Sequence, residues 1–275
     1  MSLIDISADF FDAPALTPST GQTRPHAAAA TRHTGFRAAL RMGWRITRLA
    51  AHVAVGCTRV AVLYPLVSER TQRKIRAKWS RQLLRVLGVE LQAQGPLPRP
   101  GQLLVSNHIS WVDVFVINAI SPLSFVCKDD VRSWPVLGWL VARNHTVFIR
   151  RASRSSAAEV RRELVGSLSC GRSVMVFPEG TTTDGRSVLP FRAALFQAAI
   201  DAGRAVKPVR LRYLDHDGEL SDATVYIGET TFWESVCRIA RAPRTVATVE
   251  LLPAVPTHGL TRQYLADASH AQITG

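Results

Sequence analysis

The feature that most constrains the fold is an alternation of short apolar runs with helical stretches after residue 101. Residues 112–120, 153–169 and 191–202 have helical patterns. Strands joined through helices run parallel, so the alternation predicts an α/β domain over residues 102–258, with a mostly parallel central sheet flanked by helices. Residues 259–275 are expected to form a C-terminal tail. The predicted strands are Leu103–Val105, Phe125–Cys127, Val147–Ile149, Val174–Phe177, Val206–Leu211 and Thr224–Ile227.

The net charge of +13 belongs to one segment of the chain. Residues 24–85 hold 14 Lys or Arg and one acid, whereas residues 86–275 hold 20 bases and 17 acids. A basic segment beside a nearly balanced body indicates docking on an anionic partner, either a nucleic acid or a membrane surface.

Residues 1–34 are expected to be a disordered leader. They lack the basic start and apolar stretch of a signal peptide. The four cysteines are scattered and form no CxxC pair, so the sequence does not support a zinc, iron–sulfur or dithiol redox site. Single cysteines are typical of a reducing compartment.

Residues 35–88 predict two basic amphipathic helices, the second over about Ser68–Leu87 with Gly88 as its C-cap. A charged residue at mid-bilayer is costly, so we expect the first helix to lie in the membrane interface with its arginines among lipid phosphates. The alternative is a soluble helix packed on the domain with a solvated basic stripe. A linker is expected over residues 94–101. The stripe comprises Arg37, Arg41, Arg45, Arg48, His52 and Arg59.

A polar segment containing His108 and Asp113 follows the first predicted strand. Active sites of open α/β sheets usually form at the carboxyl ends of strands. An imidazole is the natural general base near neutral pH, and a carboxylate can fix its tautomer. The two residues touch only if His108 lies in the turn before a helix and Asp113 in its first turn. Alternatively, Ser110 and Asp113 form a helix-capping pattern, and both interpretations can hold together.

A second polar segment, Phe177–Gly185, follows the strand predicted over residues 174–177. Its hydroxyls, its single glutamate and the amides freed by glycine form a polar pocket rim, although an ordinary Asp-Gly turn has the same composition. The sequence contains no nucleophile elbow, Walker loop, HExxH or dinucleotide-binding glycine motif.

Together these segments resemble the 1-acylglycerol-3-phosphate (lysophospholipid) acyltransferase family. Asn107–Asp113 is similar to its NHxxxxD motif and Phe177–Thr181 to its FPEGT motif. Lys128–Gly138 is similar to its K-x-E-L-x-x-x-P-x-x-G stretch, Phe148–Arg151 to its FIDR block and Val206–Val209 to its VPV block. Five ordered matches are far more specific than a lone HxxxxD.

The resemblance implies that His108 takes the proton from an acceptor hydroxyl, whose oxygen attacks the thioester of acyl-CoA or acyl carrier protein. Asp113 would orient His108, and neither a metal nor a cofactor is implied. The basic helices would be the membrane-docking element. The implied substrate-binding residues are Glu179, Gly180, Thr181, Phe148, Arg151 and Lys128.

Three positions depart from the family pattern. Thr182 stands where an arginine commonly grips the acceptor phosphate, Arg150 replaces the aspartate of FIDR, and His145 replaces a glycine. The first departure disfavours a phosphate acceptor, and the FPEGTT variant resembles the branch that acylates other lysolipids, including lyso-ornithine lipids. Arg150, Arg151 and Arg186 remain as cations that can hold a phosphate.

The leading hypothesis is an enzyme of the 1-acyl-sn-glycerol-3-phosphate acyltransferase type, held by anionic lipids at the cytoplasmic face of the membrane. The alternative is the same chemistry on lyso-ornithine lipid. A second alternative is a non-catalytic membrane- or RNA-binding protein that works through residues 24–85. A pure binder needs neither His108 nor Asp113, and the basic segment has few aromatic residues, so no nucleic-acid partner is expected.

Overall fold

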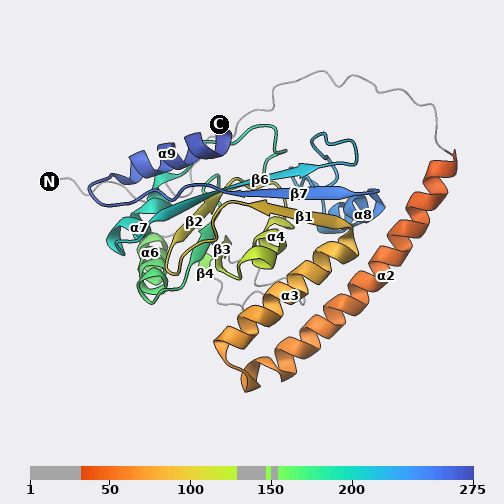
Figure 1. The fold of residues 1–275 in the computed structure, drawn as a ribbon, viewed down its shortest axis with the longest axis horizontal. Coiled ribbons are helices and arrows are strands. Elements are labelled where there is room, and N and C mark those ends of the chain that lie inside the picture. The colour runs from red at the N-terminus through yellow and green to blue at the C-terminus, as the bar shows by residue number, and fades with distance from the viewer. Residues whose placement is uncertain (1–31, 129–146, 150–153) are drawn as a thin grey trace.

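A computed structural model describes residues 32–128, 147–149 and 154–275, and its centre is a seven-stranded sheet (Figure 1). The spatial order is β1-β7-β6-β2-β5-β3-β4. Neighbouring strands are parallel except β6 and β7, which are antiparallel. The expected α/β fold with a mostly parallel sheet is therefore confirmed. The strands are β1 (Val89–Gln94), β2 (Leu103–Ser106), β3 (Ser124–Lys128), β4 (Val147–Ile149), β5 (Val174–Val176), β6 (Val206–Leu214) and β7 (Thr245–Leu251).

Helices cover both faces of this sheet. Leu104 of β2 points into a core shared with α3, α4 and α8, whereas Leu103 and Val105 point into a core shared with α6, η3 and α9. Alternating side chains of β2 thus enter two separate cores, which explains why this strand is apolar throughout. The covering helices are α3 (Glu69–Leu87), α4 (Asp113–Ile120), α6 (Arg154–Ser169), η3 (Ala193–Phe196), α7 (Gln197–Asp201), α8 (Phe232–Arg241) and α9 (Arg262–Thr274).

The strand prediction fails at three places. Thr224–Ile227 is irregular, and the buried residues Thr224 and Val225 lie in a loop whose Tyr226 amide donates to the Ile109 carbonyl at 3.1 Å. The strands β1 and β7 were not predicted. The last residue of β1 is Gln94, so the expected linker begins one residue later.

The segment expected to be a C-terminal tail instead forms α9. Leu265, Ala266 and Ile273 of this helix are buried against the sheet. Arg210 of β6 donates to the carbonyl oxygens of Gln272 at 2.7 Å and Ile273 at 2.6 Å. The α/β domain therefore extends through this helix.

The N-terminal described residues form a helical hairpin along one side of the domain (Figure 1). Helix α2 (Arg32–Val62) begins just inside the expected leader, of which residues 1–31 lie outside the described residues. A short 3-10 turn, η1 (Tyr64–Leu66), joins it to α3. Ser68 caps the start of α3, and Gly88 ends it with a φ of 78°, as the sequence predicts.

The basic stripe of α2 faces the protein over part of its length. Arg45 Nη1 donates to the Ala242 carbonyl at 2.7 Å, and Arg41 Nε donates to the Arg241 carbonyl at 3.0 Å. These carbonyls end α8, where positive charge is favourable. The expectation that the stripe lies among lipid phosphates is therefore wrong for Arg41 and Arg45.

The exposed surface of α2 is instead rich in apolar side chains. Because Arg41 and Arg45 face α8, residues on the other faces of the helix are left open to solvent. The exposed large apolar residues are Phe36, Leu40, Trp44, Val55 and Val62.

Candidate active site

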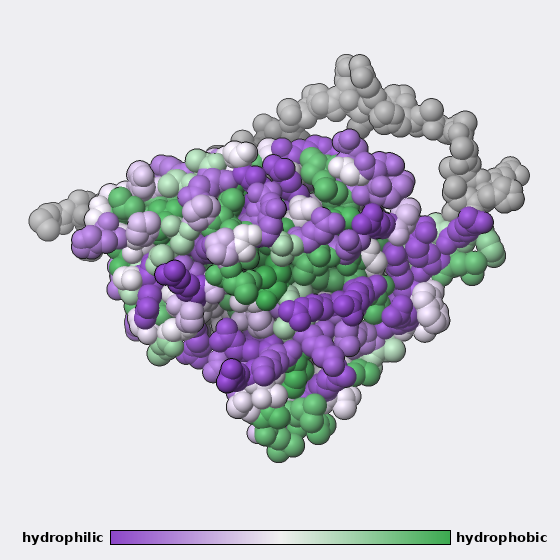
Figure 2. Space-filling model, viewed as in Figure 1, coloured by the Kyte–Doolittle hydropathy of each residue, from purple (hydrophilic) through white to green (hydrophobic). Residues whose placement is uncertain are grey.

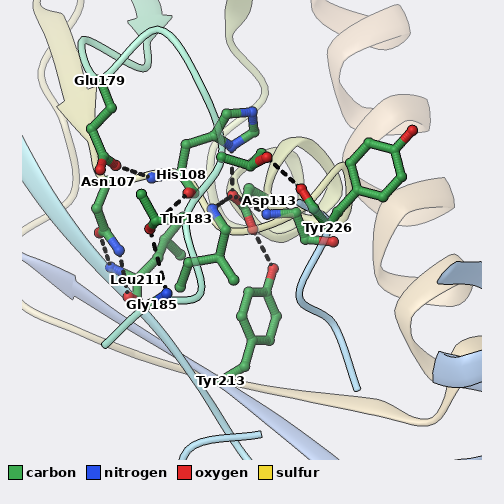
Figure 3. Close-up of polar contacts among 12 residues, drawn as sticks. Asn107, His108, Asp113, Glu179, Thr183, Gly185, Leu211, Tyr213 and Tyr226 are labelled. Atoms are coloured by element: carbon green, nitrogen blue, oxygen red, sulfur yellow. Dashed lines mark hydrogen bonds and ion pairs between the residues drawn. The ribbon is translucent and has the colours of Figure 1, made fainter. Parts of the chain in front are cut away.

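His108 and Asp113 lie where β2 is followed by α4. His108 is in the turn after the strand and Asp113 is the first residue of the helix, the arrangement that the spacing required. His108 Nδ1 and Asp113 Oδ2 are 2.7 Å apart (Figure 3). The pair has the base–orienter geometry of a catalytic histidine.

The Asp113 carboxylate is fully buried and accepts three further hydrogen bonds. Oδ2 accepts from the amides of Ile109 at 2.8 Å and Ser110 at 3.0 Å, and Oδ1 accepts from the Tyr213 hydroxyl at 2.6 Å. Of the predicted capping pattern, the bond from the Ser110 amide to the Asp113 carboxylate therefore forms together with the histidine contact. The bond expected from the Ser110 hydroxyl does not form, because this hydroxyl has no hydrogen-bond partner within the described chain.

Tyr213 is a site residue that the sequence analysis missed. It lies on β6, and its buried hydroxyl points at Asp113 (Figure 3). Burial, together with the neighbouring carboxylate, raises the pKa of Tyr213 well above that of a free tyrosine. Its hydroxyl therefore stays protonated and donates to Asp113.

The His108 imidazole remains partly open, with 21% of its side chain exposed. One face stacks on Phe177 at a centroid separation of 3.9 Å and an interplanar angle of 12°. When Nδ1 donates to the carboxylate, Nε2 carries the lone pair. Among the described residues Nε2 makes no hydrogen bond, so it is available to a substrate proton.

Glu179 is only 3% exposed and bonds to two backbone segments. Oε1 accepts from the His108 amide at 2.7 Å, and Oε2 accepts from the Leu189 amide at 2.8 Å. Burial raises the pKa of Glu179, and the two amide hydrogen bonds oppose this shift. Its carboxylate thus joins the loop after β2 to the loop after β5.

The amide of Asn107 holds the same loop to β6. Asn107 Nδ2 donates to the Leu211 carbonyl at 2.9 Å, and the Leu211 amide donates to Asn107 Oδ1 at 2.8 Å. The Thr183 amide donates to the His108 carbonyl at 2.8 Å. The backbone around His108 is therefore held to β6 and to the loop after β5.

The three positions after Glu179 differ in their surroundings. Gly180 and Thr181 are exposed, and Gly180 has a φ of 73°. An ideal Cβ on Gly180 would lie 2.9 Å from Arg192 Nε, so this position favours glycine. Thr182 turns inward, and its hydroxyl donates to the Tyr226 carbonyl.

Arg186, which follows the Phe177–Gly185 loop in the sequence, already forms ion pairs. Arg186 lies 2.9 Å from Asp222 and 3.6 Å from Asp184, measured between guanidinium nitrogens and carboxylate oxygens. These partners neutralise a side chain that the sequence left open as a phosphate ligand.

The structure describes the other predicted substrate-binding residues only in part. Lys128 ends β3 and Phe148 lies in the neighbouring strand β4, where it pairs with Cys127. Arg150 and Arg151 lie outside the described residues.

One group of potential metal ligands occurs among the described residues. Asp215, His216 and Asp217 place their ligand atoms within 4.8 Å of one another on an exposed turn. Such exposed acidic groups are common without a bound ion.

Comparison with known proteins assigns the family. Residues 88–212 match the family described as Acyltransferase. The chain is 35% identical to a lyso-ornithine lipid O-acyltransferase of Pseudomonas aeruginosa, over 83% of this chain and 90% of that protein. It is 44% identical to a 1-acyl-sn-glycerol-3-phosphate acyltransferase of Neisseria gonorrhoeae, but only over 48% of this chain and 52% of that protein.

The fold agrees with this assignment. The solved 1-acyl-sn-glycerophosphate acyltransferase of Thermotoga maritima matches with a TM-score of 0.66 at 20% identity, over 88% of this chain and 96% of that chain. At this identity the likeness concerns the fold alone. The extended match to the Pseudomonas protein carries the relationship across nearly the whole sequence, and the chain belongs to the acyltransferase family, as an enzyme of its lysolipid O-acyltransferase group.

Proposed function

We propose that this enzyme transfers a fatty acyl group from a thioester to the hydroxyl of a lyso-ornithine lipid, with His108 as general base. The observation that carries the chemistry is the 2.7 Å contact between His108 and a buried carboxylate, with Nε2 left unbonded among the described residues. An alcohol beside a thioester needs a base and correct positioning, and this pair supplies the base.

In the proposed reaction, Nε2 removes the proton from the acceptor hydroxyl while its oxygen attacks the thioester carbonyl carbon. The tetrahedral intermediate then collapses, the carbon–sulfur bond breaks, and the imidazolium returns the proton to the leaving sulfur. Asp113 stabilises the imidazolium and holds its tautomer. The donor is acyl-CoA or acyl carrier protein, and the products are an ester and a free thiol.

Four residues position this pair without touching the substrate. Tyr213 and the amides of Ile109 and Ser110 hold the carboxylate of Asp113 in place through hydrogen bonds. Glu179 was expected to line the acceptor site. Both of its oxygens bond to backbone amides, so we assign it the task of holding the His108 loop.

The acceptor contacts are assigned to exposed residues beside the pair. Gly180 and Thr181 lie on the open side of the loop, and Lys128, Phe148 and Arg151 remain proposed contacts from the sequence pattern. A neutral or zwitterionic head group fits better than a phosphate, because Thr182 replaces the clamping arginine and Arg186 is paired with acids. The extended match to a lyso-ornithine lipid acyltransferase also favours this acceptor. We therefore place lyso-ornithine lipid ahead of 1-acyl-sn-glycerol-3-phosphate, which was the leading hypothesis from the sequence.

We propose that the α2–α3 hairpin, within residues 35–88, docks the enzyme on the cytoplasmic membrane face. Gly35–Leu66 is long and apolar enough to cross a bilayer by length and composition, with 17% of its most apolar window buried. Buried core helices also pass that test. We favour an interfacial position, because the exposed apolar residues share α2 with exposed arginines such as Arg48, which lies 5.7 Å from the Trp44 ring.

The direct test is a transferase assay of the full chain in mixed micelles. Acyl-CoA and acyl carrier protein are each supplied with lyso-ornithine lipid or 1-acyl-glycerol-3-phosphate. We expect a higher kcat/KM for lyso-ornithine lipid. A preference for the phosphate acceptor would overturn the acceptor assignment, and acylation of neither would overturn the proposed function.

A further inference from the structure

A basic groove lies at the end of the sheet opposite to His108. Its volume is about 710 Å³, and it is bounded by one face of α3 from Glu69 to Arg81, the end of α4 and the turn before β5. Pro122 precedes β3 and Arg172 precedes β5, whereas His108 and Glu179 follow the carboxyl ends of β2 and β5. Since β2, β3 and β5 are parallel, the groove and the reaction site are at opposite strand ends.

The charge of the groove is strongly unbalanced. Five cationic side chains line it and Glu69 is the only acid among its lining residues. The cations are Arg70, Arg73, Lys74, Arg81 and Arg172. A concave surface with this excess attracts anions more strongly than isolated surface cations do.

Two of these cations serve the packing of α3 on α4. Arg73 Nη2 donates to the Pro122 carbonyl at 3.2 Å, and Arg81 Nε donates to the Ala119 carbonyl at 2.7 Å. Arg70, Lys74 and Arg172 have no ion pair within the described ranges, and Arg172 Nε is a buried donor without a hydrogen-bond partner there. Three cations from two parts of the fold are thus available to one ligand.

An exposed apolar tip adjoins the groove. The turn between α2 and α3 leaves Leu63 40% and Leu66 77% exposed. Figure 2 shows this apolar tip at the bottom of the molecule with hydrophilic side chains directly above it. Arg70 and Lys74 lie in the first two turns of α3, which begins three residues after Leu66.

This order of apolar and cationic residues suits a membrane surface. Interfacial elements bury their apolar side chains about 5–10 Å into the boundary between acyl chains and head groups, and neighbouring cations contact the lipid phosphates. With Leu66 at that boundary, Arg70 and Lys74 are close enough in the chain to contact head-group phosphates. A soluble acidic protein or the phosphates of CoA would satisfy the charge, but neither accounts for the apolar tip.

We propose that this groove binds the phosphate of an anionic membrane lipid, separately from the acceptor site. Arg70 and Lys74 contribute from the hairpin and Arg172 from the α/β body, so one phosphate connects the two. The inference rests on the proposed membrane location but not on the identity of the acceptor.

The test measures binding of the full chain to phosphatidylglycerol-containing vesicles by co-sedimentation. Lys74→Gln and Arg172→Gln remove groove cations. Lys78→Gln is the matched control, because Lys78 is an exposed lysine one turn further along α3 that does not line the groove. We expect vesicle binding to be about fivefold weaker for each groove variant, which is the effect of removing one cation at a charged bilayer. The control variant should bind less than about twofold more weakly than the unmodified chain.

Equal losses for Lys74→Gln and Lys78→Gln, with none for Arg172→Gln, would mean diffuse attraction and would overturn the proposal. Thermal melting confirms that each variant folds. If Arg172→Gln does not fold, the comparison of the two exposed lysines still decides between a groove and diffuse charge.

Two further measurements distinguish the source of the phosphate. Inorganic phosphate, matched in ionic strength to chloride, should leave vesicle binding unchanged, and displacement would indicate a site for a soluble anion. The KM for acyl-CoA or acyl carrier protein in neutral micelles should not change in Arg172→Gln. A raised donor KM with normal vesicle binding would assign the groove to the donor and overturn the lipid proposal. Vesicle binding needs no turnover, so its outcome is independent of the transferase assay.

Discussion

At the scale of single residues, the Asp113 carboxylate accepts hydrogen bonds from one imidazole, two backbone amides and one phenol. The spacing of His108 and Asp113 was readable from the sequence because both belong to one short turn. Tyr213 was not, because it lies 100 positions away and a tyrosine within an apolar strand has the pattern of a core residue. Likewise, a glutamate in a polar loop gives no sign that backbone amides will occupy both of its oxygens.

Asp113→Asn should lower kcat about 10²–10⁴-fold, since the neutral amide neither stabilises the imidazolium nor fixes the tautomer. The amide also places an NH₂ group against existing donors, so some stability is lost while the fold is retained. Rates at saturating acceptor and far-ultraviolet circular dichroism measure both effects. His108→Ala is the companion variant, and full activity in it would refute the proposed base.

Tyr213→Phe should lower kcat/KM about tenfold and the free energy of unfolding by about 1–3 kcal/mol, because a buried carboxylate loses one donor. The loss should fall on kcat and leave KM unchanged, because the phenol contacts the carboxylate behind the base and not the substrate. A loss of stability with an unchanged kcat would show that Tyr213 is structural only.

Thr182→Arg tests why this chain disfavours a phosphate acceptor. A charged hydrogen bond to the phosphate should raise kcat/KM for 1-acyl-glycerol-3-phosphate about tenfold relative to lyso-ornithine lipid. Thr182→Val controls for loss of the hydroxyl contact with Tyr226. If the ratio is the same in both variants, the missing arginine is not what sets the acceptor.

At the scale of elements, five predicted strands formed because each is an apolar run. The β1 strand alternates Val89, Leu91 and Ala93 with polar residues, as an edge strand does, so it lacks the continuous apolar run that marks the predicted strands. Threonines interrupt β7 in the same way. The error at Thr224–Ile227 has the opposite cause, because burial there comes from packing over the His108 loop and not from a strand ladder.

The docking of α2 on α8 depends on Arg45. Its guanidinium donates to carbonyl oxygens at the end of α8, and Gly88 leaves room for it, since a Cβ there would lie 1.9 Å from Arg45 Nη2. Arg45→Gln should increase hydrogen exchange across α2 and α8. Arg37→Gln, on an exposed part of the same helix, should leave exchange unchanged. Equal protection in both variants would mean that apolar contacts alone hold α2.

At the scale of the whole molecule, the hairpin is not one detachable unit. Leu83, Leu84 and Leu87 of α3 belong to the main core, whereas the exposed apolar surface is on α2 and the tip. The sequence suggested one membrane-associating segment over residues 35–88. The structure instead divides that segment into a helix that covers the domain from outside and a helix that completes its core.

Deletion of residues 1–67 should therefore leave a folded domain with weak vesicle binding, whereas deletion of residues 1–87 should prevent folding because buried leucines are removed. Thermal melting and vesicle flotation distinguish the two proteins. Flotation of the shorter deletion at the level of the full chain would contradict docking through α2 and the tip. A cooperative melt of the longer deletion would contradict the assigned role of α3.

The contacts around His108 also determine when the enzyme becomes active. Its loop is held by partners 71 positions away through Glu179 and 104 positions away through Asn107. Such distant pairings form late in folding, because long loops must close first. A partly synthesised chain therefore contains α2 and the His108–Asp113 segment before β6 exists to hold that segment. We expect transferase activity to begin only after the second half of the chain is made.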